Sequence, residues 1–438
     1  MKKILAFLLL CLFLLTVAGC SKNDENTLYF LNFKPESAEA YNKIAEKYKA
    51  EPGTTLRVVT AASGTYEQTL KSEISKNDAP VLFQLNGVIG YTAWKDYCKD
   101  LSNTEIYKHL NDPELAITSG EGVYGIPAVV EGYGIIYNKE ITDRYFALSG
   151  RSTTFTSMDD INSFSKLSAL VRDMTARKDE LGIKGVFAST SLKSGEDWRF
   201  QTHLANLPIY YEFKDKKIDI TKDDLSKVDF SYNEKYKQLF DLYLQNSTTD
   251  PKLLGSKQVA DSMAEFALGQ CAMVQNGNWA YSQIAGVSGN TVKQENAKFL
   301  PIYIGADGEE AQGLCVGTEN YFAINAKASP EKQKMAEDFL AWLYTSETGK
   351  DLVSNELNFI APYDTFEDDD APSDPLGREI QIWMNKENIN TVPWVFSVFP
   401  GQNFKADFGA ALLQYAQGTK SWSDVVSTFV NRWEEEAT

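Results

Sequence analysis

The sequence predicts an α/β protein of two lobes, from an alternation of strands and helices and from a late return of the same pattern. Short apolar segments of strand composition occupy 27–33, 54–61 and 79–86, and helical segments join them. Apolar strands joined by helices favour parallel pairing in a sheet that helices cover on both faces. The segment 319–326 and the helix after it repeat this pattern, so we expect the chain to cross between the lobes more than once.

The helices are predicted from apolar residues that recur at the helical period. These positions are Tyr41, Ile44, Ala45 and Tyr48 in 35–51, Tyr66, Leu70 and Ile74 in 64–76, and Ala336, Phe339, Leu340 and Leu343 in 329–349. We expect mainly helices from about 140 to 300 and again at the end of the chain. The first lobe should comprise 27–130 with 316–355, and the second 131–315 with 356–438.

The N-terminus predicts export and a lipid anchor. Two lysines precede an unbroken apolar run at 4–15, which is too short to span a bilayer. Residues 17–20, Val-Ala-Gly-Cys, resemble the lipobox of bacterial lipoproteins, in which cleavage leaves a lipidated cysteine at the mature N-terminus. We therefore expect a signal peptide at 1–19, acylation of Cys20, a leash at 20–26, and an extracytoplasmic protein held to the membrane by lipid alone. The alternative is an ordinary signal peptide with an incidental cysteine.

Composition and charge exclude some partners. The chain has a formal net charge of −17 and no basic cluster, so nucleic acid is not an expected partner. The same charge disfavours a strongly anionic ligand, although a local arginine could override it. The mature cysteines beyond the anchor, Cys98, Cys271 and Cys315, fit no zinc pattern and form at most one disulfide.

Catalytic motifs are sparse. The Gly-x-Gly-x-x-Gly run at 120–125 leads into a strand, whereas a dinucleotide site needs a helix there. His109 and His203 lie in no His-Glu-x-x-His motif, and the acidic run 367–370 lacks the glycine and final glutamate of a calcium loop. A pair of carboxylates for glycoside hydrolysis is not excluded, because a sequence does not show how far apart two carboxylates lie in space. We expect no catalytic residue, no cofactor and no metal.

Polar side chains gather where the first three strands end, which is where ligands bind in open α/β sheets. They are Asn32, Lys34, Glu36, Ser63, Gln84 and Asn86. Taken alone, each is more simply interpreted as an ordinary solvated loop residue. A second candidate is the segment 266–284, FALGQCAMVQNGNWAYSQI, which places Trp279 and Tyr281 after an Asn-Gly-Asn turn. Trp279 is either a core residue or a binding platform.

The lipobox, the opening strand-helix unit and the segments 125–141 and 266–284 together resemble the extracellular solute-binding proteins of carbohydrate ABC importers, near the maltose/maltodextrin type. The resemblance implies a two-lobed periplasmic-binding-protein-like fold with the ligand in the interlobe cleft. It implies that Trp279 is a sugar-stacking platform with Tyr281 as a second aromatic. It also places a ligand-binding carboxylate at Glu131, with Tyr133 where the family has an aliphatic residue.

The same resemblance implies further contacts. Segment 194–206 places a stacking aromatic at Trp198 with Glu196 as a neighbouring acceptor, and Lys34 and Asn86 fall in loops that contact hydroxyls. A final aromatic is expected at Trp394, with Phe399 as the substitute. Asn86 and Gly87 replace a charged pair of the maltodextrin type, so the same maltose contacts are not expected.

These residues suit a sugar, because an aromatic plate accommodates the apolar face of the ring and polar groups bond its hydroxyls. We expect a monomer, without enzymatic activity, that captures an oligosaccharide at the outer cell surface and delivers it to an ABC transporter permease. The alternatives are a lipid-anchored binding protein for a non-sugar solute, such as an anion, a polyamine or an iron complex, and an extracellular glycosidase.

Overall fold

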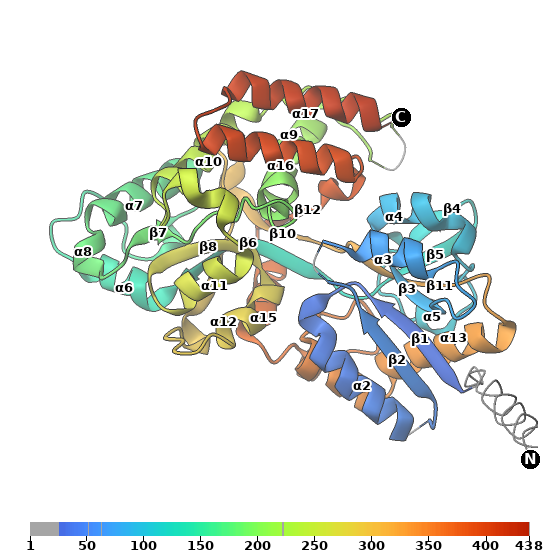
Figure 1. The fold of residues 1–438 in the computed structure, drawn as a ribbon. Helices are drawn as coiled ribbons and strands as arrows, with labels where there is room; N and C mark the ends of the chain where they lie inside the picture. Colours follow the sequence, from blue (N-terminus) through green and yellow to red (C-terminus); the bar gives the residue numbers. More distant parts are fainter. Residues whose placement is uncertain (1–25, 51, 63, 221–222, 438) are drawn as a thin grey trace, which may run out of the picture.

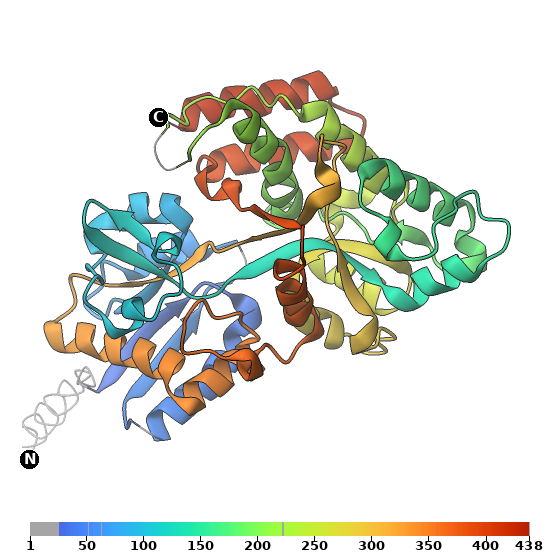
Figure 2. The ribbon, with the colours of Figure 1, turned by 180° about the vertical axis from the view of Figure 1, so that it is seen from behind.

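The computed structural model describes residues 26–50, 52–62, 64–220 and 223–437. It has two lobes, each built on one six-stranded sheet (Figures 1 and 2). The signal peptide, Cys20 and Ser63 lie outside the described residues, so the predictions made for them stay predictions. Within the described part of the chain, no helix is both long and apolar enough to cross a membrane.

The first lobe is a mixed sheet with strand order β2-β1-β3-β11-β5-β4. Its strands are β1 (Thr27–Asn32), β2 (Thr55–Thr60), β3 (Leu82–Asn86), β4 (Ile117–Ser119), β5 (Gly122–Pro127) and β11 (Asn320–Ile324). β1 pairs in parallel with β2 and β3, as predicted, whereas β11 runs antiparallel to β3 and β5. The glycine run at 120–125 lies in the β4–β5 hairpin.

Helices cover both faces of this sheet because alternate strand residues point to opposite sides. They are α2 (Ala38–Ala50), α3 (Tyr66–Glu73), α4 (Gly87–Trp94), α5 (Glu105–Lys108), α13 (Pro330–Thr345) and α14 (Glu347–Leu352). Leu28 and Phe30 pack into the core under α2 and α13, and Tyr29 and Leu31 into the core under α3. The apolar positions predicted for α13 are all buried.

The second lobe has the strand order β12-β10-β6-β8-β7, with β9 also paired to β6. Its strands are β6 (Glu131–Asn138), β7 (Gly185–Phe187), β8 (Cys271–Gly277), β9 (Ala297–Leu300), β10 (Gln312–Gly317) and β12 (Asn390–Pro393). Its helices are α6 (Lys139–Ala147), α7 (Phe164–Ala176), α8 (Lys178–Leu181), α9 (Ala205–Lys216), α10 (Asn233–Gln245), α11 (Val259–Ala267), α12 (Tyr281–Ala285), α15 (Pro375–Met384), α16 (Gln402–Ala416) and α17 (Trp422–Glu436).

The chain changes sheet three times, at β5 to β6, at β10 to β11 and again before α15 (Figure 2). β11 therefore belongs to the first sheet, as the repeated pattern predicted. The first and third crossings lie side by side, because the Val130 amide donates to the Ile360 carbonyl at 2.8 Å. The residue boundaries of the lobes given above stay a prediction.

Candidate ligand-binding site

Six aromatic side chains of the second lobe meet at its border with the first. This aromatic cluster consists of Tyr133, Trp198, His203, Trp279, Trp394 and Phe396. The Trp279 ring centroid lies 5.9 Å from that of Trp198 and 6.3 Å from that of Trp394. Tyr133 stacks on His203 at 4.3 Å. The structure thus brings together three tryptophans that lie far apart in the sequence.

Gly277 explains how Trp279 reaches this position. The strand β8 ends at Gly277, a short helical turn at Asn278–Ala280 follows, and the Trp279 ring folds back over the glycine. A Cβ atom on Gly277 would lie 2.2 Å from the ring, closer than any side chain tolerates. The Asn278 side chain fixes the turn by accepting a hydrogen bond from the Gly132 amide at 3.0 Å. The ring is partly exposed, and its Nε1 has no hydrogen-bond partner within residues 26–50, 52–62, 64–220 and 223–437.

Trp394 is placed in the same way. A Cβ atom on Gly317 would meet its ring at 2.6 Å, so this glycine also makes room for a tryptophan. Trp394 is 5% exposed, and its Nε1 has no hydrogen-bond partner. Phe399, the substitute considered for it, packs instead against Phe404 and Trp433 in the core of the lobe. Of these two candidates, only Trp394 joins the aromatic cluster.

Trp198 comes just before a π-helical turn, Arg199–Leu204, a type of helix that is rare and often occurs at functional sites. The Arg199 guanidinium stacks on the Trp198 ring at 3.7 Å, and His203 from the same turn packs against Trp198 and Trp279. Burial and the Arg199 charge hold the pKa of His203 well below its usual range, so the imidazole is neutral. The neighbouring Glu196 accepts a hydrogen bond from the Val259 amide at 3.2 Å.

A buried ion pair lies beside the cluster. Lys34 Nζ is 2.7 and 2.9 Å from the two carboxylate oxygens of Glu131, and 3.5 Å from Glu36 Oε1. Lys34 and Glu131 are both buried, whereas Glu36 is more exposed. Burial lowers the pKa of the Lys34 ammonium, but the carboxylates of Glu131 and Glu36 together outweigh burial, so the pKa is raised. Burial raises the pKa of Glu131, against the opposing effect of Lys34.

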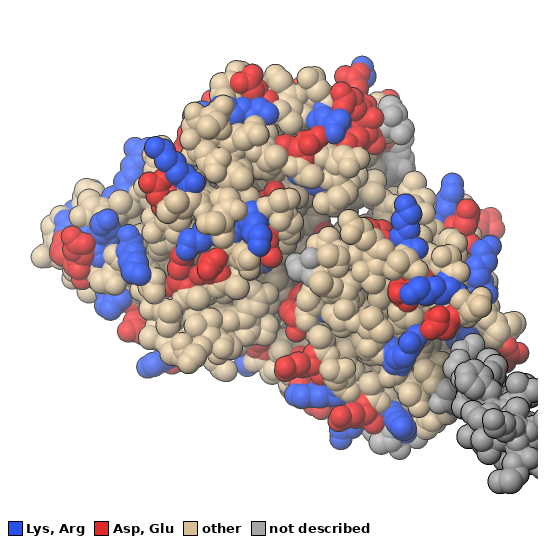
Figure 3. Space-filling model, in the orientation of Figure 1, with Lys and Arg blue, Asp and Glu red and all other residues tan. Residues whose placement is uncertain are grey.

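Lys34 also joins the two lobes. It follows β1 in the first lobe, and its Nζ lies 5.7 Å from the centroid of the Trp279 ring in the second. Asn32 holds this loop, since its side chain accepts from the Lys34 amide and donates to the Lys34 carbonyl. The space-filling view shows a furrow between the lobes (Figure 3).

Other predicted residues play different parts. Asn86 precedes α4 and is partly buried, and Gln84 is fully buried, bonding the Phe33 amide and the Asn320 side chain. Tyr281 packs against the separate core around Ile284, so the structure does not bring it into the aromatic cluster.

Sequence reasoning missed Arg199, His203, Glu319 and Lys405 as members of this region. Burial raises the pKa of Glu319, and the charge of Lys405 partly offsets this rise. Burial lowers the pKa of Lys405, and the charge of Glu319 partly offsets this fall. The only signal for Arg199 was its place next to Trp198. Cys98, Cys271 and Cys315 are buried and free, and no group of three or more metal-ligating side chains occurs among the described residues.

Comparison with known proteins identifies the family. Residues 43–377 match the sequence model for bacterial extracellular solute-binding proteins, which is more than half of the chain. The chain belongs to this family. A solute-binding protein of this family acts outside the cytoplasm, which agrees with the export signal expected from the sequence.

A curated relative of this solute-binding protein is the melibiose/raffinose/stachyose-binding protein MelE of Bacillus subtilis (strain 168), 27% identical over 149 residues. The match covers 32% of this chain and 34% of the relative, about a third of its length. Solved structures share the fold at low identity. A chitin oligosaccharide binding protein has a TM-score of 0.69 at 17% identity, covering 94% of this chain and 98% of its own. RafE in complex with raffinose has a TM-score of 0.68 at 16% identity, covering 93% of this chain and 99% of its own. Maltose-bound T. maritima MalE3 has a TM-score of 0.67 at 14% identity, with the same coverage of 93% and 99%.

Proposed function

We propose that this solute-binding protein captures an oligosaccharide between its lobes, without chemical turnover, and delivers it to the permease of an ABC importer. The observation that carries the proposal is the meeting of three tryptophans with a Lys34–Glu131 pair at the border of the lobes. Aromatic faces accommodate the C–H face of a sugar, and the charged pair offers a donor and acceptors for hydroxyls.

Unpaired polar atoms support the proposal. Nε1 of Trp279, Nε1 of Trp394 and Nδ2 of Asn320 are buried donors without a partner in the part of the chain that the structure describes. Buried donors nearly always have a partner, and an unmade hydrogen bond costs about 1–3 kcal/mol. A ligand rich in hydroxyls would satisfy such donors. Relatives named for melibiose, raffinose, chitin oligosaccharides and maltose point in the same direction.

Closure of the lobes is the proposed means of capture. Lys34 of the first lobe contacts Trp279 of the second, so a ligand between them would touch both lobes at once. Contacts that form only when the lobes meet favour the closed state, as in hinge-closing proteins. Trp279, Trp198, Trp394, Glu131, Lys34 and Glu36 are the proposed contacts, with Asn32 and Asn86 as loop residues that shape the first lobe's side.

We also propose that Cys20 carries the lipid anchor, that residues 20–26 are a lipid-anchored leash, and that the protein works as a monomer at the outer face of the cytoplasmic membrane. The anchor keeps the captured ligand near the permease.

A glycan panel tests the function. Isothermal calorimetry of the mature chain against di- to pentasaccharides of gluco-, galacto-, xylo- and chito-type should detect at least one ligand with micromolar or tighter affinity. Incubation with that ligand should leave it uncleaved by chromatography. Absence of binding to every saccharide, or release of free sugar, would contradict the proposal.

A further inference from the structure

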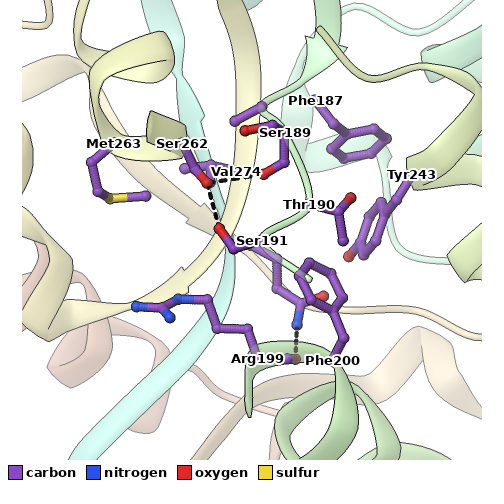
Figure 4. A pocket seen from close by; sticks show the side chains of 12 residues that line it. Phe187, Ser189, Thr190, Ser191, Arg199, Phe200, Tyr243, Ser262, Met263 and Val274 are labelled. Atoms are coloured by element: carbon purple, nitrogen blue, oxygen red, sulfur yellow. Dashed lines mark hydrogen bonds between the residues drawn. The ribbon is translucent and has the colours of Figure 1, made fainter. Parts of the chain in front are cut away.

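A small cavity lies in the second lobe beside Trp198. It is formed where β7 ends beside the middle of β8, between the segment 188–191 and the helices α10 and α11 (Figure 4). The empty space of this cavity, together with its open mouth, is about 340 Å³.

Arg199 lines this cavity and is 4% exposed. Two of its guanidinium nitrogens, Nε and Nη1, are buried without a hydrogen-bond partner among the described residues. Burial lowers the pKa of Arg199 to about 9, so the group is still charged at neutral pH. An unpaired buried charge is costly, and proteins normally provide it with a partner.

The protein does not supply that partner from the cavity walls. Among the described residues that line the cavity, Arg199 is the only charged one. Its polar neighbours are Ser189, Thr190, Ser191 and Ser262, and Ser191 and Ser262 bond each other at 2.9 Å. Ser189 Oγ and Gln275 Oε1 are also buried without partners. In Figure 4 the Arg199 guanidinium extends to the side where Ser191 and Met263 lie.

Arg199 is close to the proposed sugar platform. Its guanidinium stacks on the Trp198 ring, which packs against Trp279. Gln275 fixes the start of the π-helical turn by donating to the Arg199 carbonyl at 2.7 Å. Glu196 and, from the first lobe, Glu36 favour the charged form of Arg199 through space and oppose the effect of burial on its pKa.

We propose that Arg199 binds a carboxylate carried by the captured saccharide, so that the preferred ligand contains an acidic sugar unit such as a uronic acid. This inference rests on the proposed sugar-binding function and narrows its substrate class. A planar carboxylate accepts two parallel hydrogen bonds from a guanidinium and neutralises its single charge. A sulfate or phosphate ester shares the anionic chemistry, but a dianionic phosphate would leave a charge unmatched by the single arginine.

Matched saccharides test the inference without any substitution. Each pair consists of a tetrasaccharide with one glucuronic acid unit and the same tetrasaccharide with that acid reduced to glucose, on gluco-, galacto- and xylo-type backbones. By calorimetry, the acidic member of at least one pair should bind about tenfold or more tightly. Equal or weaker binding of the acidic members, or tighter binding of a sulfated or phosphorylated analogue, would overturn the proposal.

Variants assign the effect to Arg199. Arg199→Gln should abolish the preference for the acid, and Arg199→Lys should keep part of it, whereas Arg172→Gln, which removes an exposed arginine from the same lobe, should leave it intact. Circular dichroism shows whether each variant folds; if Arg199→Gln does not fold, the wild-type pairs alone decide. A preference that survives in folded Arg199→Gln would refute the assignment. Binding only of neutral panel members would end this inference and leave the proposed function standing, whereas binding of no saccharide would end both.

Discussion

The ammonium of Lys34, in the first lobe, lies 5.7 Å from the ring centroid of Trp279, in the second. The same ammonium bonds both carboxylate oxygens of Glu131, at the start of the strand that leads from one lobe to the other. One buried charge therefore links a loop, a crossing strand and an aromatic ring.

The Lys34–Glu131 pair should behave as one unit in stability. Lys34→Met leaves a buried carboxylate and Glu131→Gln leaves a buried ammonium, and each should cost about 3–5 kcal/mol of unfolding free energy. The double variant should lose about 1–3 kcal/mol less than the sum of the two, because no buried charge is left alone. Urea unfolding of the four proteins measures this coupling. Strictly additive losses would show that the two groups act independently.

Gly277 should be required for the position of Trp279. In Gly277→Ala the new Cβ would lie 2.2 Å from the ring, so the indole must move out of the aromatic cluster. Saccharide affinity should fall at least about tenfold, and tryptophan emission should shift. Gly401→Ala is the matched control, because Gly401 has φ −64° and its Cβ would meet its nearest neighbour at 3.6 Å. Equal affinity in both variants would contradict the platform geometry.

Asp374 should make stability depend on pH. Its Oδ1 accepts from the Gly377 amide while Oδ2 is buried and unpaired, and burial raises its pKa from 3.8 to about 6. The folded chain thus holds this proton more tightly than the unfolded chain, so the carboxyl lowers stability as pH rises from about 4 to 6. Asp374→Asn should be more stable than wild type by about 3 kcal/mol at pH 7.5, and the difference should shrink to less than about 1 kcal/mol near pH 4.

Urea unfolding at pH 4, 5, 6 and 7.5 checks this prediction. Asp424→Asn is the control, because hydrogen bonds from Ser421 lower the pKa of Asp424 and its charged form is favoured in the folded chain. That variant should gain nothing at neutral pH. A gap between Asp374→Asn and wild type that does not change with pH would show that Asp374 is not the titrating group.

Cys20 should decide where the protein is found. Cys20→Ala removes the acceptor for the lipid, and the protein should then appear in the medium or periplasm after cell fractionation. The wild-type protein should stay with membranes through detergent-free washing. A Cys20→Ala variant that also stays with membranes would rule out the lipobox assignment.

The opening strands and helices were predictable because their apolar periods are local, as at Tyr41, Ile44 and Tyr48 in α2. Membership of β11 in the first sheet followed from a repeated pattern. The aromatic cluster was harder to predict from the sequence, because contacts between residues far apart in the chain determine which aromatic side chains belong to it. Tyr281 turns to another core two residues after Trp279, and Gly317, distant in sequence, makes room for Trp394.

The polar part of the site was harder still. Asn32 was predicted to bind ligand, and Gln84 was one of the polar side chains noted at the strand ends. In the structure Asn32 bonds the backbone of Lys34, and Gln84 bonds the Phe33 amide and the Asn320 side chain. Arg199 could not be placed, since burial and the absence of a partner for its nitrogens arise only when β7, β8 and the π-helical turn meet. The sequence thus shows that a loop residue is polar, but the packing around it decides whether its polar atoms bond other groups of the protein or stay available to a ligand.

The role of Trp279 as a sugar platform is tested most directly by a saccharide titration of Trp279→Ala beside the wild type, by calorimetry and tryptophan fluorescence. We expect that a saccharide found in the panel changes wild-type emission, and that its affinity falls about thirtyfold or more in Trp279→Ala. The loss of unfolding free energy should stay below the 3–5 kcal/mol expected for Trp433→Ala, whose ring is fully buried. A large loss of stability in Trp279→Ala with unchanged affinity in the folded fraction would contradict the platform role and make Trp279 a core residue.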